Sequence, residues 1–445
     1  MIDDTSPPPQ DKSEYKTLLR RFARNALVIL RGRFVFGLLN LATAGILWRA
    51  IGPEAFGIIV LLQAYIRLVT SLVRLQTWAA IVRYGPGAVD RGDDAALGRL
   101  TGFTLRLDAF GFSAAILIVL LVTEAVTQWM NFPPEFALLA PFFILSAPFI
   151  VTATPTGILQ LFGRVDVLAG QHALNAVLRF VGAGAVTLLG GGLIWVAVIW
   201  IAASVLSGLY MMAMAWREMR SRGLKPWLGG RWGTLTAGFE KIWRFSLVMN
   251  GNSLIETVVN HLTVLLVGGL LGPAAAGLFG VVRQITEATS KLGTALGPVI
   301  FPEMALLAAR NDRAQMRRVL KRILLAFGGF MAVFVAALAL VGELLLVTLF
   351  DASAGQGAEL LVLVGAASSF VVIGFALEPA MLSIGKDRQL LTLSFFVTIA
   401  YVGVLLLGIE LVGLIGVGLA LFLRQAAIFS GRFLTIRRYL LKPQS

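Results

Sequence analysis

Long apolar runs alternate with short basic segments along almost the whole chain. Five runs contain no lysine or arginine and are long enough for two membrane-crossing helices each, since one crossing needs about 20 apolar residues; they span residues 107–163, 180–216, 245–282, 323–385 and 389–423. A sixth apolar region covers residues 28–78. Basic residues beside membrane helices stay on the cytoplasmic side, so each cation-free run predicts a hairpin that reaches the outer side. The pattern predicts an all-α, polytopic membrane protein of about twelve helices with both termini in the cytoplasm.

The polar segments between the runs predict the domain organisation. Residues 1–26 form a basic segment, which we expect to be amphipathic and to lie on anionic phospholipid at the cytoplasmic surface, or to act only as a topology anchor. Residues 27–215 are expected to form a first six-helix bundle, residues 216–243 a basic cytoplasmic linker, and residues 244–445 a second six-helix bundle with a basic tail. The expected helices lie near residues 30–50, 54–82, 99–122, 136–160, 167–189, 193–215, 244–269, 274–300, 321–349, 358–382, 388–409 and 412–435.

An internal repeat relates the two expected bundles. The pattern G-P-x-A-x-G occurs at residues 52–57 and again at residues 272–277, an offset of 220. Further pairs lie at nearly the same offset: Asn40 with Asn260, and Gly163-Arg164 with Gly385-Lys386. Because each half would contain six helices, both halves have the same orientation in the membrane. This is the parallel-repeat arrangement of transporters, in which the substrate path runs between the two bundles.

Composition and charge support a membrane protein. The chain is 58% hydrophobic and 14% charged, whereas a soluble domain is about one quarter charged. The net charge is +14, but the basic residues follow the topology bias of a membrane protein and do not indicate nucleic acid binding. The expected outer loops carry only acidic residues, with Arg49 as the exception. We therefore expect a protein of the bacterial plasma (inner) membrane.

The sequence contains no recognisable catalytic or metal-binding motif. It has no cysteine, which excludes disulfides, thiol catalysis and cysteine-based metal sites. A phosphate-binding G-x-x-x-x-G-K-[ST] loop, a paired-histidine zinc motif and a G-x-S-x-G nucleophile motif are all missing from the sequence. We expect no enzymatic activity, no metal site and no cofactor, apart from a coupling Na⁺ or H⁺.

Charged residues at membrane depth are costly, so they are expected to face a cavity or a partner. Two matching helices each carry a polar stripe at helical spacing: Gln63, Arg67, Ser71 and Arg74 on one, and Arg283, Glu287 and Lys291 on the other. We predict that Arg67, Arg74, Arg283 and Lys291 bind an anionic substrate, because the planar guanidinium suits phosphate, and that Gln63, Asn40 and Glu287 line the same cavity. Further candidates are Arg106, Asp108, Arg179, Glu378 and Arg424.

Simpler roles for these charges remain open. Glu287 is spaced to neutralise Arg283 as an i, i+4 pair, and the side chains of Arg74, Arg106, Arg179 and Arg424 are long enough to reach the inner interface.

A second polar stripe predicts ion coupling. Asn252, Glu256 and Asn260 lie four residues apart on one helix face. A carboxylate with amide neighbours at mid-depth is suited to binding Na⁺ or carrying a proton, while the alternative is a hydrogen-bonded packing contact between helices. His261 is a weaker proton-relay candidate, since isolated histidines are usually structural.

The chain resembles the polysaccharide flippases, which export O-antigen and exopolysaccharide repeat units and belong to the multidrug/oligosaccharidyl-lipid/polysaccharide exporter superfamily. The resemblance covers nearly the whole chain and rests on these stretches: Arg24-Asn25, LWRAIGPEAFGIIVLLQAYIRL from Leu47, AIVRYG at residues 80–85, Gly163-Arg164, and LLGPAAAGLFGVVRQI from Leu270. It implies a V-shaped pair of six-helix bundles like those of the multidrug exporters.

The resemblance also implies a function. The expected substrate is a polyprenyl-diphosphate-linked oligosaccharide, moved from the inner to the outer leaflet by ion-coupled alternating access, and other polysaccharide assembly proteins are expected partners. The predicted arginine stripe would then bind the diphosphate. Two alternatives remain: a drug or organic-cation antiporter of the same superfamily, and a membrane polysaccharide polymerase. The first helix lacks an acidic residue, which disfavours cationic drugs, and the short outer loops disfavour a polymerase.

Overall fold

The computed structural model describes residues 12–150, 152–227, 229 and 232–441, and this part of the chain is helical with no strand. The side chains of residues 12–35, 248–253, 255–256, 288 and 290–299 lie outside that description. The described helices, in chain order, are α1 (Lys12–Val73), α2 (Thr77–Asp90), α3 (Asp94–Trp129), α4 (Pro134–Leu145), α5 (Ala147–Ile150), α6 (Ala153–Leu161), α7 (Val165–Leu188), α8 (Leu193–Ser221), α9 (Trp232–Thr236), α10 (Ile242–Leu271), α11 (Pro273–Ala309), α12 (Arg313–Leu349), α13 (Ala358–Ile373), α14 (Leu377–Ser383), α15 (Asp387–Val412) and α16 (Leu414–Leu441), with a 3₁₀ turn, η1 (Ala352–Gly357), before α13.

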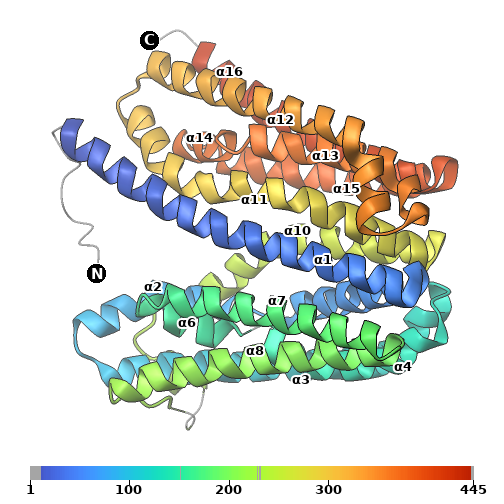
Figure 1. Ribbon diagram of the computed structural model, residues 1–445. Helices are drawn as coiled ribbons and strands as arrows, with labels where there is room; N and C mark the ends of the chain where they lie inside the picture. The colour runs from blue at the N-terminus through green and yellow to red at the C-terminus, as the bar shows by residue number, and fades with distance from the viewer. Residues whose placement is uncertain (1–11, 151, 228, 230–231, 442–445) are drawn as a thin grey trace.

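The helices form two bundles that lie side by side. In Figure 1, α2 to α8 (cyan to green) form the lower bundle and α10 to α16 (yellow to red) the upper one. Helix α1 runs along the boundary and contacts α3, α4 and α7 of one bundle and α10 and α11 of the other. The described start of α1 and end of α16 lie at the same end of the molecule (Figure 1). The all-α, two-bundle prediction is confirmed.

Several described helices are suited to the membrane. Seven are long and apolar enough to cross a bilayer, and an eighth crossing results if the bent pair Pro134–Leu145 and Ala147–Leu161 is one span. The chain is therefore a multi-pass membrane protein, while the count of about twelve crossings stays a prediction.

The internal repeat is visible in the backbone. Gly52 and Gly272 both end a helix with positive φ, at 80° and 90°, and both precede the proline of the repeated motif. Gly163 and Gly385 also match, with φ of 70° and 69°. Residues with a Cβ rarely adopt these dihedrals, so glycine is needed at each turn. Equivalent turns therefore occur at equivalent places in the two halves.

Two expected helices are broken in the N-terminal bundle. The helix expected near residues 54–82 ends at Val73, and α2 starts at Thr77. The helix expected near residues 136–160 is divided into α4, α5 and α6 and bends by 55°. Proline contributes to this second break, since Pro141, Pro148 and Pro155 each lack a backbone donor.

Asp108 on α3 accepts hydrogen bonds from a residue at each break. Its Oδ1 accepts from the Thr77 hydroxyl at 2.7 Å, and its Oδ2 accepts from the Thr154 hydroxyl at 2.7 Å and the Thr154 N–H at 3.1 Å. The side chain is 7% exposed, and Arg74 lies close enough to interact with it electrostatically. Broken helices are tolerated inside a membrane only where the freed groups find partners, and Asp108 provides one for the Thr154 N–H.

The helix boundaries also differ from the expected domain boundaries. Helix α1 is continuous from Lys12 to the turn at Gly52, so residues 12–26 are the first part of a long helix and not a separate element. The expected linker, residues 216–243, contains the end of α8 and the short helix α9. The segment before residue 12 lies outside the described residues.

The hydrophobic core explains how the bundles are joined. One cluster contains residues of both halves, such as Leu47, Phe136, Phe279 and Phe350, and lies toward the end that carries the Gly52 and Gly272 turns. Toward the opposite end, one cluster holds only residues between Ala80 and Ile242. A third holds only residues between Met304 and Ile436. The two bundles therefore share a core at one end, and at the other end their cores are separate except that the start of α10, at Ile242, packs into the N-terminal cluster.

The two copies of the G-P-x-A-x-G motif meet where the bundles join. A Cβ on Gly277 would lie 3.1 Å from the Pro53 carbonyl oxygen and 3.2 Å from the Gly57 Cα. A Cβ on Gly57 would overlap the carbonyl group of Pro273. Small residues let helix backbones approach closely in membranes, so the motif forms the seam between α1 and α11.

We expect Gly57→Ala to destabilise the closed seam by about 1–3 kcal/mol, because the added methyl group has no space beside the Pro273 carbonyl. The control is Gly184→Ala on α7, where a Cβ meets nothing within 4 Å and alanine favours the helix by about 0.5–1 kcal/mol. Thermal unfolding of both purified variants measures the difference. Equal unfolding midpoints for the two variants would contradict the assignment of the seam.

Candidate functional site

A cavity of about 320 Å³ lies between the two bundles, where α1, α7, α8, α10 and α11 face one another. Its volume is at the lower end of ordinary ligand pockets, which hold about 300–1,000 Å³. Its polar and aromatic lining consists of Asn40, Thr43, Phe56, Gln63, Arg67, Arg179, Trp200, His261, Arg283, Gln284 and Glu287. Both halves of the repeat therefore contribute to one central site.

The described lining of this cavity is positively charged. Arg67, Arg179 and Arg283 supply three guanidinium groups, and Glu287 supplies one carboxylate, which leaves a net charge of +2. Arg67 is exposed to the cavity space. A cationic cavity inside a membrane protein attracts anions and repels cations.

Arg283 is already paired within its own bundle. Its Nε lies 2.6 Å from Glu287 Oε1, and its Nη1 donates to the Asn260 carbonyl oxygen at 2.8 Å. The sequence analysis gave an i, i+4 ion pair between Glu287 and Arg283 as an alternative role for Glu287, and the structure shows this ion pair. The side chains of Arg283 and Glu287 remain 25% and 41% exposed, so an anion in the cavity can still reach the guanidinium.

The structure brings together about half of the predicted site residues. Those that line the cavity are Asn40, Gln63, Arg67, Arg283 and Glu287. Arg74 lies outside the described lining and beside the buried Asp108. The Asn260 side chain is exposed and also lies outside that lining, although its backbone carbonyl binds Arg283. The side chains of Lys291, Asn252 and Glu256 lie outside the described residues.

Two residues that line the cavity, Arg179 and Trp200, were not among the predicted binding residues. Arg179 was only a further candidate with an interfacial alternative, and Trp200 was not singled out. Trp200 is 7% exposed and lies well inside α8, whereas tryptophans that anchor membrane helices lie at their ends. The position of Trp200 away from the expected helix ends was the sequence feature that could have indicated this part of the site.

Arg49, the one basic residue in the expected outer loops, binds the end of a helix in the other bundle. Its guanidinium donates to the carbonyl oxygens of Thr348 and Phe350 at the end of α12, in the other bundle. The last carbonyls of a helix lack helical partners and readily accept such bonds. The neighbouring Trp48 packs edge-on against Phe350, with ring centroids 5.8 Å apart. Arg49 and Trp48 thus hold α1 against α12 at the end where the bundles share a core. The sequence predicts that this end faces outward, so we call these contacts the outer latch.

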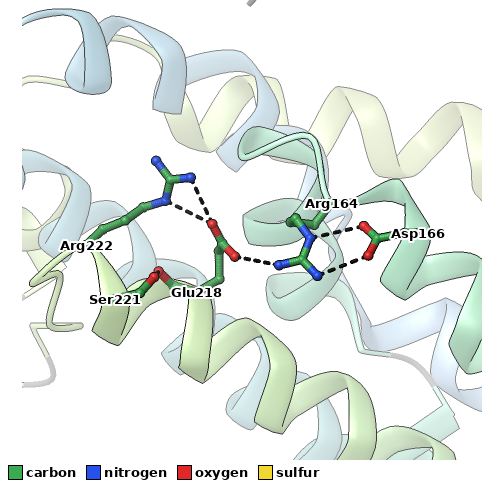
Figure 2. A network of polar contacts seen from close by, with 5 residues as sticks. All are labelled: Arg164, Asp166, Glu218, Ser221 and Arg222. Carbon is green, nitrogen blue, oxygen red and sulfur yellow. Dashed lines mark hydrogen bonds and ion pairs between the residues drawn. The ribbon is translucent and has the colours of Figure 1, made fainter.

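An ion-pair network holds the opposite end of the N-terminal bundle (Figure 2). Arg164, at the repeated Gly-Arg turn, binds both carboxylate oxygens of Asp166 at 3.0 Å and Glu218 at 2.9 Å, and Glu218 also binds Arg222 at 2.8 Å. The hydrogen bonds from Arg164 lower the pKa of Asp166. The network joins the start of α7 to the end of α8, the two helices that carry Arg179 and Trp200.

Comparisons with known proteins agree with this architecture. A family model described as polysaccharide biosynthesis protein matches residues 22–307. Inner membrane protein YghQ of Escherichia coli (strain K12) is 27% identical over 316 residues, which cover 71% of this chain and 88% of YghQ.

Solved transporter structures share the fold. A multidrug resistance transporter of the MATE family of the MOP superfamily, in its inward-facing conformation, has a TM-score of 0.74 at 17% identity and covers 92% of this chain and 98% of its own. The lipid II flippase MurJ, in an inward closed conformation, has a TM-score of 0.68 at 13% identity, with 92% of this chain and 87% of MurJ covered.

We expect Arg49→Ala to open the outer latch. The loss of these partly exposed hydrogen bonds should cost about 1 kcal/mol and shift the equilibrium about fivefold toward states with separated bundles. The chain has no cysteine, so spin labels at Glu54→Cys and Ala274→Cys, both exposed, can report the distance between the closed ends. Arg437→Ala, an exposed cation at the other end, is the control. A distance distribution that Arg49→Ala leaves unchanged would rule out a latch.

We expect Glu287→Gln to strengthen the binding of inorganic pyrophosphate by up to about fivefold. The substitution removes the carboxylate that competes for Arg283, and a partly exposed ion pair is worth about 0.2–1 kcal/mol. Calorimetric titration of the purified protein measures the affinity, with Glu124→Gln, an exposed acid outside the cavity, as the control. Weaker binding by Glu287→Gln would contradict the competition.

Proposed function

Because the chain belongs to the polysaccharide biosynthesis protein family, we propose that it is a flippase of the bacterial inner membrane. Its proposed substrate is a polyprenyl-diphosphate-linked oligosaccharide, which it moves from the inner to the outer leaflet for surface polysaccharide assembly. The observation that supports this proposal most strongly is the cavity between the bundles, whose described lining has a net charge of +2.

The chemistry of the cavity suits a diphosphate. Arginine forms charge-assisted, often bidentate hydrogen bonds with phosphate oxygens. Three arginines on α1, α7 and α11 reach the cavity from different sides. With about 320 Å³, the cavity is suited to the charged headgroup, while the lipid chain and most of an oligosaccharide would extend beyond it.

Alternating access follows from the way the bundles are joined. They share a core at the Gly52 and Gly272 end and have separate cores at the end with the basic loops. By the positive-inside rule the basic end is cytoplasmic, so the cavity in this state is closed toward the outside. Export then requires the seam and the outer latch to open while the cytoplasmic ends come together.

Ion coupling and partners are further parts of the proposal. Glu256, with Asn252 and Asn260 on the same helix, is the proposed site for a coupling Na⁺ or H⁺. Lys291 and Arg74 remain proposed contacts for a diphosphate that enters from the cytoplasmic end. Anionic phospholipid at the basic loops and other polysaccharide assembly proteins are the proposed partners.

A drug exporter would need a different cavity. Organic cations are repelled by a lining of three arginines and one glutamate, so the electrostatics favour the flippase over a cation antiporter with the same fold. The experiment below distinguishes the two.

We expect deletion of the gene in its host to cause polyprenyl-diphosphate oligosaccharide to accumulate in the cell and surface polysaccharide to be lost. Mass spectrometry of the lipid extract and analysis of the surface glycan measure both. Complementation with Arg67→Gln or Arg283→Gln should restore less than about one tenth of the export, since a lost charged hydrogen bond costs about 1.5–3 kcal/mol.

Two other outcomes would overturn the proposal. Normal surface glycan with increased sensitivity to cationic dyes would indicate a drug exporter. Short, unpolymerised glycan that still reaches the surface would indicate a polymerase. Complementation with Arg437→Gln, which changes a cation outside the cavity, controls for expression and insertion.

A further inference from the structure

A small second pocket opens beside the central cavity in the N-terminal bundle. It has a volume of about 20 Å³ and shares four lining residues with the central cavity: Gln63, Arg67, Arg179 and Trp200. About 10–15 Å³ is enough for one water-sized group, so the pocket admits a single oxygen atom and excludes a sugar ring. It lies between α1, α4, α5, α7 and α8 and is lined only by residues of this half.

Arg179 is held in position at the mouth of this pocket. Its Cζ lies 4.9 Å from the centroid of the Trp200 ring, and its Nη2 donates to Ser204 Oγ at 3.3 Å. Ser204 Oγ in turn donates to the Trp200 carbonyl oxygen at 2.8 Å. Stacking on the indole fixes the plane of the guanidinium, so the side chain is ordered before any ligand arrives.

Two buried hydrogen-bond donors of Arg179 and Trp200 have no acceptor within the described part of the protein. The Nε of Arg179 and the Nε1 of Trp200 are both buried, and neither has a hydrogen-bond partner among the described residues. Trp200 itself is 7% exposed. Buried donors are normally paired, and an unpaired one is destabilising unless a ligand or water satisfies it.

The charges around the pocket are not balanced locally. Arg67 and Arg179 are close enough to interact with each other electrostatically, and the pocket has no acidic residue in its described lining. Arg283 across the cavity differs, because Glu287 already binds it. The unbalanced positive charge of the cavity is therefore concentrated in the N-terminal bundle.

We propose that Arg179, Trp200 and Arg67 form a phosphate subsite, in which one non-bridging oxygen of a diphosphate enters the small pocket. The Arg179 guanidinium and the Trp200 indole N–H donate to this oxygen, and Arg67 lies beside the same phosphate group. The second phosphate lies in the central cavity toward Arg283. This inference rests on the proposed function and deepens it: the N-terminal bundle holds the headgroup, and the C-terminal bundle completes the site.

The test is calorimetric titration of the purified, full-length protein with inorganic pyrophosphate. We expect Arg179→Gln to weaken binding at least tenfold. Trp200→Phe keeps the stacking ring but removes the N–H donor, and we expect it to weaken binding about threefold to tenfold. Arg179→Lys keeps the charge but not the planar fork and should recover only part of the affinity.

Arg437→Gln is the control. Arg437 is an exposed cation near the end of α16 and is outside both pockets. It should bind pyrophosphate like the unmodified protein. Thermal unfolding of each variant separates lost binding from lost folding, and Trp200→Phe, which conserves the ring packing, tests the subsite even if Arg179→Gln unfolds.

The outcomes separate this inference from the proposed function. Unmodified protein that fails to bind pyrophosphate would contradict the diphosphate cavity as a whole. Normal binding by Arg179→Gln and Trp200→Phe, together with weak binding by Arg283→Gln, would overturn only the subsite. Orthophosphate or short-chain phosphatidylglycerol that binds as tightly as pyrophosphate would also contradict it, because the proposed ligand spans both the pocket and the cavity.

Discussion

The close packing of α1 against α11 is the constraint on which the other features depend. Gly57 and Gly277 allow the two motifs to touch backbone to backbone, and one hydrophobic core then spans both bundles at this end. No side chain can be accommodated between Gly57 and Pro273, so this seam is either closed or separated, with little room for intermediate arrangements. Because the opposite ends have separate cores, closure at the seam leaves space between the bundles, and the cavity occupies that space.

The charged residues have roles that depend on where they lie relative to the seam. Arg49 caps the end of α12 across the closed end, and Arg164 joins α7 to α8 at the other end. Asp108 is buried in one bundle, where it binds a threonine beside each of two helix breaks. Among the arginines whose side chains the structure describes, those between these levels, Arg67, Arg179 and Arg283, line the cavity. Two of them belong to the N-terminal half, so the two halves share their glycine turns and differ in the charge that they bring to the cavity.

The sequence predicted those features that depend on local pattern. The membrane character, the two bundles, the repeated Gly-Pro turns, and Gln63, Arg67 and Arg283 of the site follow from hydropathy and helical spacing. The breaks at residues 74–76 and within residues 134–161 were missed; the residues beside them, Thr77 and Thr154, bind Asp108, a contact between helices that a local pattern does not reveal. Arg74 and Arg67 are indistinguishable on a helical wheel, yet only Arg67 is in the described lining of the cavity. Trp200 was missed because its importance comes from stacking with Arg179 on a neighbouring helix.

Translocation in a defined membrane tests the central claim most directly. The purified protein is reconstituted into liposomes with a polyprenyl-diphosphate oligosaccharide, and the fraction of headgroups accessible from outside to a glycan-modifying enzyme is measured over time. Our account predicts that accessibility of the inner-leaflet pool increases with the unmodified protein, and that Arg67→Gln slows this by at least about tenfold. Equal rates in liposomes with and without the protein, or transport that Arg67→Gln leaves unchanged, would contradict a flippase that acts through this cavity.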